Sequence, residues 1–228
     1  MSERECRPEL LDEQEWPLDE VSGNLRDMER AHAVLGVRRR VLSFADRVEA
    51  PDVPLTVLDL GTGSGWLPRA LHARAAARGR TLRVVGLDCN RTVLEVARRS
   101  GGAPLYCRAD VRSLPFPARS FDLVTCSMSL HHFSRNDALE LLRTMDAIAR
   151  RGWILCDLVR SRSLVWLASA ATRVFSANAL TRHDGPASAR RAFSLRELGE
   201  LALDAGVTGA VVRRFSLVCG EIAKRSRR

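Results

Sequence analysis

A glycine-rich turn directly behind a short apolar run constrains the fold of this chain more than any other feature. The stretch reads VLDLGTGSGW over residues 57–66, with glycines at positions 61, 63 and 65. A turn of this kind after a buried strand brings a ligand close to the main chain, because glycine has no side chain that would keep the ligand away. The sequence therefore predicts a strand, a ligand-binding turn and a helix, in that order.

Strand-like and helix-like segments alternate beyond that turn. The strands that we expect there cover residues 55–60, 81–88, 103–110, 120–129 and 151–159. The helices that we expect between them cover residues 66–79, 90–100 and 136–150. Strands that alternate with helices are typical of βαβ units, whose parallel sheet is covered on both faces. Residues 209–223 add two short strands with little between them, which predicts a final antiparallel hairpin.

The segment before the turn has a helical pattern. Residues 1–23 are acidic and contain two prolines, so we expect a loosely held lead-in. Apolar residues recur at helical spacing over residues 24–48, and the sequence PDVP at 51–54 then breaks the chain. We therefore divide the chain into an N-terminal helical lead-in or lid, residues 1–50, and a ligand-binding domain, residues 51–228.

The segment after the fifth strand is less regular. Residues 163–180 are apolar and predict a helix, whereas residues 183–193 read as a loop. Ser194 and Glu197 have the spacing of a capping box, which predicts that another helix begins there.

Composition sets limits on partners and surroundings. The formal charge is +9, and Lys224 is the only lysine. This arginine bias fits either a GC-rich genome or an anionic partner, since net charge informs on association and not on fold. The six cysteines have no metal-ligand or redox spacing, so no metal site is expected. The chain shows no secretory signal and no apolar run of about 18 residues, so we expect a cytoplasmic protein without a membrane span.

The spacing of the glycines separates two classes of ligand. Dinucleotide-binding turns have the pattern GxGxxG, whose third glycine allows close packing of helix and strand. Here the pattern is GxGxG, and Trp66 stands at the position of that third glycine. A triphosphate-binding loop is excluded as well, because no Lys-Ser/Thr pair follows the glycines. The turn therefore argues against NAD, FAD and ATP.

Three aspartates point to a different ligand. Asp59 lies just before the glycine turn, and Asp88 and Asp110 end the next two strands. The carboxyl ends of parallel strands meet at one crevice, where ligands of open α/β sheets bind. Carboxylates there would repel a pyrophosphate but suit a ribose, a base and an ammonium group. S-adenosylmethionine has these groups and no phosphate.

Several longer motifs now support a family resemblance. VLDLGTGSG, GLDCN, ADVRSLPFPARSFDLV, SMSLHHF and RGWILCDLVRS resemble successive motifs of the Rossmann-like, class I S-adenosylmethionine-dependent methyltransferases that act on small molecules. The resemblance covers residues 55–160 strongly and 190–223 more weakly. It implies an α/β fold with a seven-stranded, mostly parallel sheet, an antiparallel last strand and helices on both faces. It also implies a methyltransferase of secondary metabolism that modifies a small hydrophobic or phenolic metabolite, with O-methylation favoured.

The resemblance implies a donor site built from the first motif and the ends of the following strands. The residues that it places at the methionine portion of the donor are Asp59, Gly61, Thr62, Gly63 and Gly65. The residues that it places at the nucleoside and the sulfonium are Asp88 on the ribose hydroxyls, Cys89 beside the adenosine, Asp110 and Val111 at the adenine, and Ser127 under the sulfonium. Trp66 departs from the family pattern, which has a small or acidic residue there.

The acceptor side is expected beyond the fourth and fifth strands. His131 is the candidate general base, and His132, Asp157 and Arg160 are candidate substrate contacts. The two histidines have structural alternatives, and alignment of donor and acceptor can supply much of the rate without a base. The acceptor and the oligomeric state stay open.

Three rival functions compete with this interpretation of the sequence. A nucleic-acid methyltransferase fits the arginine content, but it would have NPPY or DPPY where this chain has SMSLHHF. A non-catalytic donor-binding protein is compatible with the motifs, whereas Trp66 disfavours an oxidoreductase.

Overall fold

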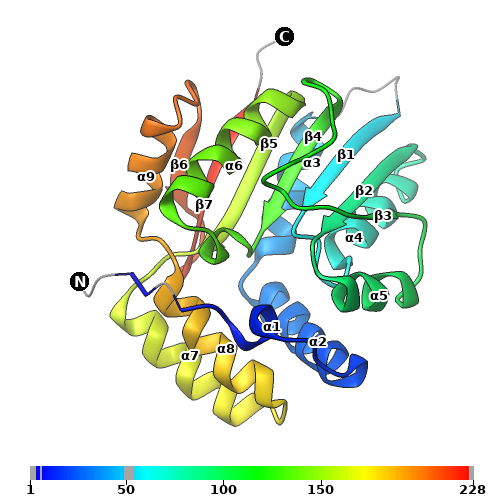
Figure 1. Ribbon diagram of the computed structural model, residues 1–228. Helices are drawn as coiled ribbons and strands as arrows, with labels where there is room; N and C mark the ends of the chain where they lie inside the picture. Colours follow the sequence, from blue (N-terminus) through cyan, green and yellow to red (C-terminus); the bar gives the residue numbers. More distant parts are fainter. Residues whose placement is uncertain (1–3, 6, 49–53, 226–228) are drawn as a thin grey trace.

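A single seven-stranded sheet forms the centre of the computed structural model, which describes residues 4–5, 7–48 and 54–225 (Figure 1). The strand order is β3-β2-β1-β4-β5-β7-β6. The strands are β1 Leu55–Leu60, β2 Leu82–Asp88, β3 Leu105–Arg108, β4 Phe121–Ser127, β5 Ala149–Leu158, β6 Val211–Arg214 and β7 Cys219–Arg225. Strands β1 to β5 pair in parallel, and β7 is antiparallel to both β5 and β6. The predicted fold class, with only the last strand reversed, is confirmed.

Helices surround this sheet. They are α1 Leu10–Glu13, α2 Leu18–Val34, α3 Val37–Val48, α4 Trp66–Ala76, α5 Arg91–Arg99, α6 Arg135–Ile148, α7 Arg162–Phe175, α8 Ala179–Arg191 and α9 Leu195–Asp204, with a 3₁₀ turn η1 at Leu130–His132. The predicted capping box is present at the start of α9, where Ser194 accepts from the Glu197 amide and Glu197 accepts from the Ser194 amide. No helix among the described residues is long and apolar enough to cross a membrane. The domain boundary predicted between residues 50 and 51 lies outside the described residues.

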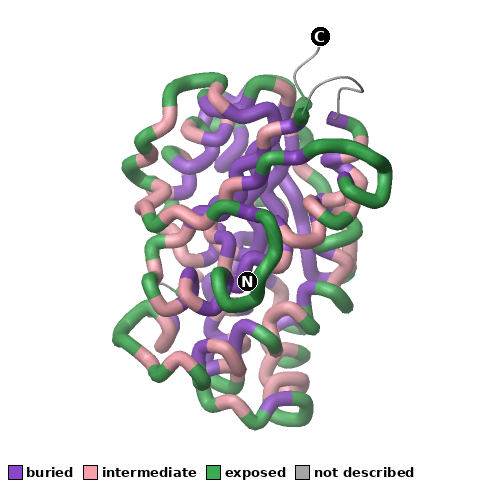
Figure 2. Tube along the Cα trace, turned by 90° about the vertical axis from the view of Figure 1, so that its right-hand side faces the viewer, coloured by how far each residue is buried: buried purple, intermediate pink, exposed green. Residues whose placement is uncertain are grey.

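Alternating side chains of the central strands build two hydrophobic layers. On β1, Leu55 and Val57 pack into the cluster formed with α3 and α4. Leu58 and Leu60 pack into the cluster formed with α6 and α9. Successive side chains of a strand point to opposite faces, so a strand covered on both faces is apolar almost throughout. Figure 2 shows the resulting buried core along the middle of the molecule.

A third layer lies beneath the carboxyl ends of the strands, where α1, α2, α7 and α8 are grouped (Figure 1). The loop predicted at residues 183–193 is wrong, because α8 continues through Gly185 and Pro186 as far as Arg191. Gly185 lets α8 approach α7, since a Cβ atom there would lie 2.5 Å from Thr172 Cγ2. Packing against α7 thus overrides the turn preference of the Gly-Pro pair.

The loosely held lead-in predicted at residues 1–23 is also wrong for the described part of that segment. Helix α2 begins at Leu18, and α1 forms just before it. The amides of Leu10 and Leu11 donate to the carboxylate of Asp184 on α8, at 2.9 and 3.3 Å. The partner that orders α1 lies far away in the sequence, so local composition gave no sign of it.

Candidate functional site

The glycine turn between β1 and α4 requires its glycines. Gly61, Gly63 and Gly65 have φ angles of 63°, 56° and 74°, in the left-handed region that other residues rarely adopt. At two of these positions a side chain would also clash with a neighbouring residue. A Cβ atom on Gly61 would lie 2.3 Å from Ser129 Oγ, and one on Gly65 would lie 2.2 Å from the hydroxyl of Tyr106. The bare backbone is therefore needed to fit the turn between the ends of β3 and β4.

Asp59 is buried at the end of β1, with only 2% of its surface exposed. Its two carboxyl oxygens accept from Thr62 Oγ1 at 2.8 Å and from Thr125 Oγ1 at 2.6 Å. Burial raises the pKa of Asp59 to about 7, although the two hydroxyls partly offset the effect and Asp88 adds to it. The site therefore holds a carboxyl group that a neighbouring cation would ionise.

Asp88 ties the glycine turn to the start of α5. One oxygen accepts from the Gly63 amide and the other from the Asn90 amide, both at 3.0 Å. Burial raises the pKa of Asp88, and the two amide hydrogen bonds partly offset this. Cys89 next to it is exposed. The structure thus brings Asp59, Asp88 and the three glycines together at one end of the sheet, as predicted.

The predicted adenine contacts lie farther along the same edge. Asp110 is partly buried and pairs with Arg112 at 2.6 Å, and this hydrogen bond lowers the pKa of Asp110. Val111 is partly buried against the layer formed by α6 and α9. Both residues follow β3, and their contact with adenine stays a prediction.

The end of β4 has an unusual backbone. Ser127 is buried, and its hydroxyl has no hydrogen-bond partner among the described residues. Met128 follows with a φ of 58°, a conformation that is costly for a residue with a side chain. Such positions are retained where the surrounding structure enforces them, and they cluster at functional sites. An unpaired hydroxyl and a strained residue thus mark the point where the sequence places the sulfonium.

His131 and Asp157 form a buried pair on the acceptor side. His131 Nδ1 lies 2.8 Å from Asp157 Oδ1, and the His131 amide donates to Asp157 Oδ2 at 2.9 Å. Burial tends to raise the pKa of Asp157, but His131 outweighs it, so the pKa is lowered. Asp157 therefore fixes the ring of His131 and leaves Nε2 facing the N-terminal segment.

His132 points toward the N-terminal segment as well. Its Nδ1 lies 2.7 Å from Asp12 Oδ2, and its Nε2 lies 3.7 Å from Glu9 Oε2. Burial tends to lower the pKa of His132, but Glu9 and Asp12 outweigh it and raise the pKa to about 9. Arg160, in contrast, donates to the Ala192 carbonyl and to Glu197, and so holds the end of β5 to the start of α9. Substrate contact by Arg160 stays a prediction.

Several residues of this region were missed by the sequence analysis. Glu9 and Asp12 reach the histidines from α1 and the residue before it. His32 on α2 is 7% exposed, and its Nδ1 has no partner among the described residues. Burial lowers the pKa of His32 to about 4, and the nearby His131 contributes in the same direction. No local pattern could have identified these residues, because each lies in an ordinary helical stretch.

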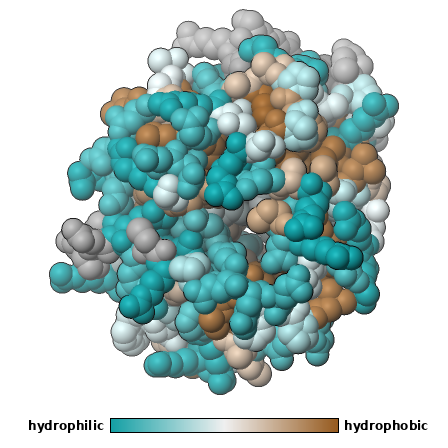
Figure 3. Space-filling view, viewed as in Figure 1, coloured by the Kyte–Doolittle hydropathy of each residue, from teal (hydrophilic) through white to brown (hydrophobic). Residues whose placement is uncertain are grey.

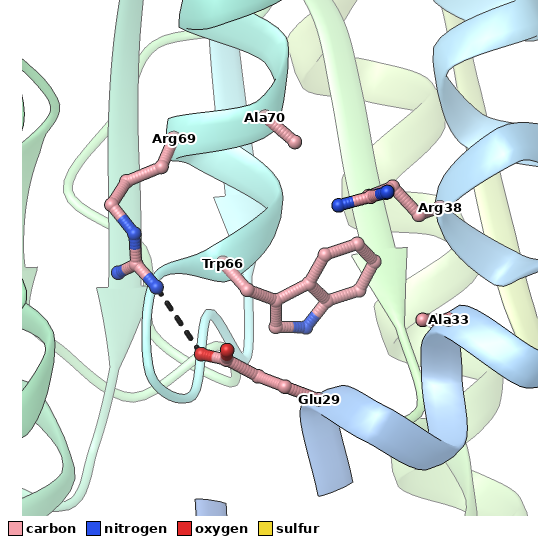
Figure 4. Close-up of a pocket in the computed structure, with 6 residues that line it drawn as sticks. All are labelled: Glu29, Ala33, Arg38, Trp66, Arg69 and Ala70. Atoms are coloured by element: carbon pink, nitrogen blue, oxygen red, sulfur yellow. Dashed lines mark hydrogen bonds and ion pairs between the residues drawn. The ribbon is translucent and has the colours of Figure 1, made fainter. Parts of the chain in front are cut away.

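Trp66, the residue that departs from the family pattern, lies at the start of α4. Its ring is 5.7 Å from that of His32 and lines a cavity of about 310 Å³ between α2, α3 and α4 (Figure 4). Glu29 also lines this cavity, and its carboxylate accepts hydrogen bonds from Ser64 of the glycine turn and from Arg69. A small hollow is visible near the centre of Figure 3, which shows the molecule from the same side as Figure 1.

Comparisons with known proteins agree with this geometry. Residues 57–152 match a family model described as a methyltransferase domain. The ubiquinone/menaquinone biosynthesis C-methyltransferase UbiE of Enterobacter sp. is 31% identical over 186 residues, which are 74% of this chain and 71% of that protein. The demethylmenaquinone methyltransferase of Thermotoga maritima is 32% identical over 114 residues, which are 50% of this chain but only 45% of that protein.

A solved structure shows the same fold at low identity. The plantazolicin methyltransferase BpumL, determined in complex with SAH, has a TM-score of 0.64 at 13% identity. The match covers 91% of this chain and 96% of that chain.

The sheet and the glycine turn define a Rossmann-like α/β protein of the seven-stranded type. Together with its relatives, they show that the chain belongs to the S-adenosylmethionine-dependent methyltransferases of class I. It is therefore an enzyme, and S-adenosylmethionine is its methyl donor.

Proposed function

We propose that this enzyme transfers the methyl group of S-adenosylmethionine to a small hydroxylated acceptor, a phenolic or similarly hydrophobic metabolite. The observation that carries this proposal is the buried Asp157–His131 pair beside the end of β4. A carboxylate on Nδ1 fixes the imidazole so that Nε2 can meet the hydroxyl of an acceptor. The fixed ring supports His131 as the candidate general base, with Nε2 on the side of Glu9.

For the donor site we propose the assignment that the sequence predicts. Asp59 and the glycine turn, including Thr62, take the methionine portion. Asp88 takes the ribose hydroxyls, and Ser127, whose hydroxyl is unpaired, lies under the sulfonium. The remaining contacts are assigned to Cys89, Asp110 and Val111.

The N-terminal helices and residues 160–192 would cover the acceptor site. This role is supported by the layer that α1, α2, α7 and α8 form beneath the carboxyl ends of the strands. The buried, unpaired Nδ1 of His32 lies within that layer. Residues 1–50 would accordingly act as a lid rather than as an independent unit.

O-methylation is the reaction that the sequence motifs favour. A second candidate is C-methylation, because UbiE of Enterobacter sp. is a C-methyltransferase. Both reactions begin from an ionised hydroxyl. The phenolate attacks the methyl group through its oxygen in the first case and through a ring carbon in the second.

Incubation with methyl-labelled donor and a panel of phenols, catechols and hydroxylated quinones tests this function. Mass spectrometry should show a labelled product that depends on the enzyme, and NMR should place the methyl group on oxygen or carbon. His131→Gln should lower turnover by about 10²–10⁴-fold, the usual range for a lost general base, with unchanged affinity for S-adenosylhomocysteine. Labelling of nucleic acid, with no labelled small molecule, would overturn the proposal.

A further inference from the structure

Two imidazole nitrogens and one carboxylate converge beneath the sheet. His131 Nε2 lies 3.5 Å from Glu9 Oε1, and His132 Nε2 lies 3.7 Å from Glu9 Oε2. One ligand atom from each of these three residues can be chosen so that all lie within 4.8 Å of one another. Glu9 and His131 are buried, at 4% and 3% exposed. Three ligand-bearing groups therefore face a common point, where Glu9 and His131 are shielded from bulk water and His132 is partly exposed.

The spacing of these atoms is not that of a hydrogen-bonded cluster. Hydrogen bonds between nitrogen and oxygen span about 2.7–3.2 Å, so both contacts of Glu9 with the imidazoles are too long. Two ligand atoms that are each about 2.1 Å from a metal ion lie roughly 3.0–3.4 Å apart at tetrahedral or octahedral angles. The two contacts of Glu9, one through each carboxylate oxygen, exceed that range by only a few tenths of an ångström.

Each of the three ligand residues is also oriented by a hydrogen-bonding partner, as in known metal sites. The Nδ1 atom of His131 is 2.8 Å from Asp157, and that of His132 is 2.7 Å from Asp12. Ser188 Oγ donates to Glu9 Oε1 at 2.7 Å and so orients the third ligand. Metal-bound histidines almost always donate their other ring nitrogen to such a carboxylate or carbonyl, which fixes the tautomer.

We propose that Glu9, His131 and His132 form a binding site for one divalent transition-metal ion, with Asp12 and Asp157 orienting the two imidazoles. Two imidazoles and one carboxylate favour ions such as Zn²⁺, Co²⁺ or Fe²⁺, whereas Mg²⁺ favours oxygen ligands and water. Three protein ligands leave coordination positions open, as catalytic sites do.

This site deepens the proposed function, since the open positions would receive the ionised oxygen of the acceptor. In the metal-bound form His131 would act as a ligand and not as the base, and the acceptor hydroxyl would lose its proton to water, because a bound ion lowers the pKa of an oxygen that it coordinates. The ion itself can be tested without any knowledge of the acceptor.

The test is calorimetry of Zn²⁺ binding to untagged, metal-free protein. One ion should bind per chain. Glu9→Gln and His132→Gln should each weaken binding by at least about 100-fold, and Asp12→Asn by about 10–100-fold, as expected for loss of an orienting carboxylate. Glu13→Gln and His72→Gln carry the same changes outside the cluster and should bind like the wild type. The visible spectrum of the Co²⁺ form should show nitrogen and oxygen ligands without thiolate.

Binding of S-adenosylhomocysteine is measured in every variant as a check of the fold and the donor site. Unchanged donor affinity together with lost Zn²⁺ binding supports the metal site. The proposal is overturned if the wild type binds Zn²⁺ with a dissociation constant weaker than about 100 μM, or not at all. It is overturned equally if Glu9→Gln and His132→Gln bind as tightly as the controls. Failure of the proposed function would instead appear as absent methyl transfer from a protein that still binds the metal.

Discussion

Asp59 is a carboxyl group held in an environment that penalises its charge. It is buried, two hydroxyls donate to it, and its pKa is raised to about 7. An ammonium group beside it would favour the ionised form, because an opposite charge stabilises a buried carboxylate. The residue is therefore suited to a ligand that brings its own positive charge.

The affinity for the donor should consequently depend on pH. Asp59 must be ionised to attract the ammonium group, so protonation below pH 7 weakens binding. Between pH 8 and pH 6, the affinity for S-adenosylhomocysteine should fall by about tenfold, since one pKa unit corresponds to a factor of ten. Calorimetry at the two pH values measures this, and Asp59→Asn should bind weakly with a flatter profile. Equal pH dependence in wild type and Asp59→Asn would remove Asp59 from the ammonium site.

The raised pKa of Asp59 also makes the stability of the ligand-free protein depend on pH. A carboxyl group whose pKa is raised on folding contributes stability below its unfolded pKa, and this contribution is lost as the pH rises through the folded value. For Asp59 this window runs from the ordinary pKa of 3.8 to about 7. Asp59→Asn should therefore stabilise the ligand-free protein more at pH 8 than at pH 5.

Asp88 has two tasks in this structure. The sequence predicts hydrogen bonds to the ribose, and the structure adds bonds from the Gly63 and Asn90 amides. Asp88→Ala should weaken donor binding by at least about tenfold, because hydrogen bonds to a charged group are worth roughly 1.5–3 kcal/mol. It should also lower the melting temperature, since two amides lose their acceptor. Unchanged affinity with lowered stability would leave Asp88 a purely structural role.

At the scale of elements, the contact between α7 and α8 shows what local patterns could not reveal. Strands β1 to β5 were predictable because runs of apolar residues between turn signals specify a buried strand locally. Helix α8 was missed because Gly185 and Pro186 are turn residues in most sequences. What keeps the segment helical is the surface of α7, and no local pattern encodes that surface.

This contact can be tested by a pair of substitutions. Gly185→Ala adds a Cβ atom that would lie 2.5 Å from Thr172 Cγ2. It should cost about 1–3 kcal/mol, the usual range for overpacking. Thr172→Ser removes that methyl group, so the double variant should regain much of the lost stability in urea unfolding. Additive losses in the double variant would show that α7 and α8 do not meet closely at Gly185.

At the scale of the whole molecule, the two halves of the site differ in how far the sequence could predict them. The glycine turn, Asp59 and Asp88 lie within one βαβ unit, so alternation and spacing are sufficient to place them together. The cluster of Glu9, His131 and His132 joins two adjacent histidines to a glutamate more than a hundred positions earlier in the sequence. Metal-ligand spacing cannot be read from such a set, which is why the sequence predicted no metal site.

The net charge of +9 is also a property of the whole molecule. Arginines on separate elements pair with nearby carboxylates, such as Arg74 and Arg78 with Asp46, and Arg135 with Asp204. If the charge only reflects composition, the protein should bind a random DNA duplex with a dissociation constant above about 1 μM at physiological salt, as expected for non-specific contacts. The affinity should then fall steeply as the salt concentration rises. Fluorescence anisotropy over a salt series measures this. Nanomolar, sequence-selective binding at physiological salt would favour a nucleic-acid acceptor, because phosphate contacts alone do not select a sequence.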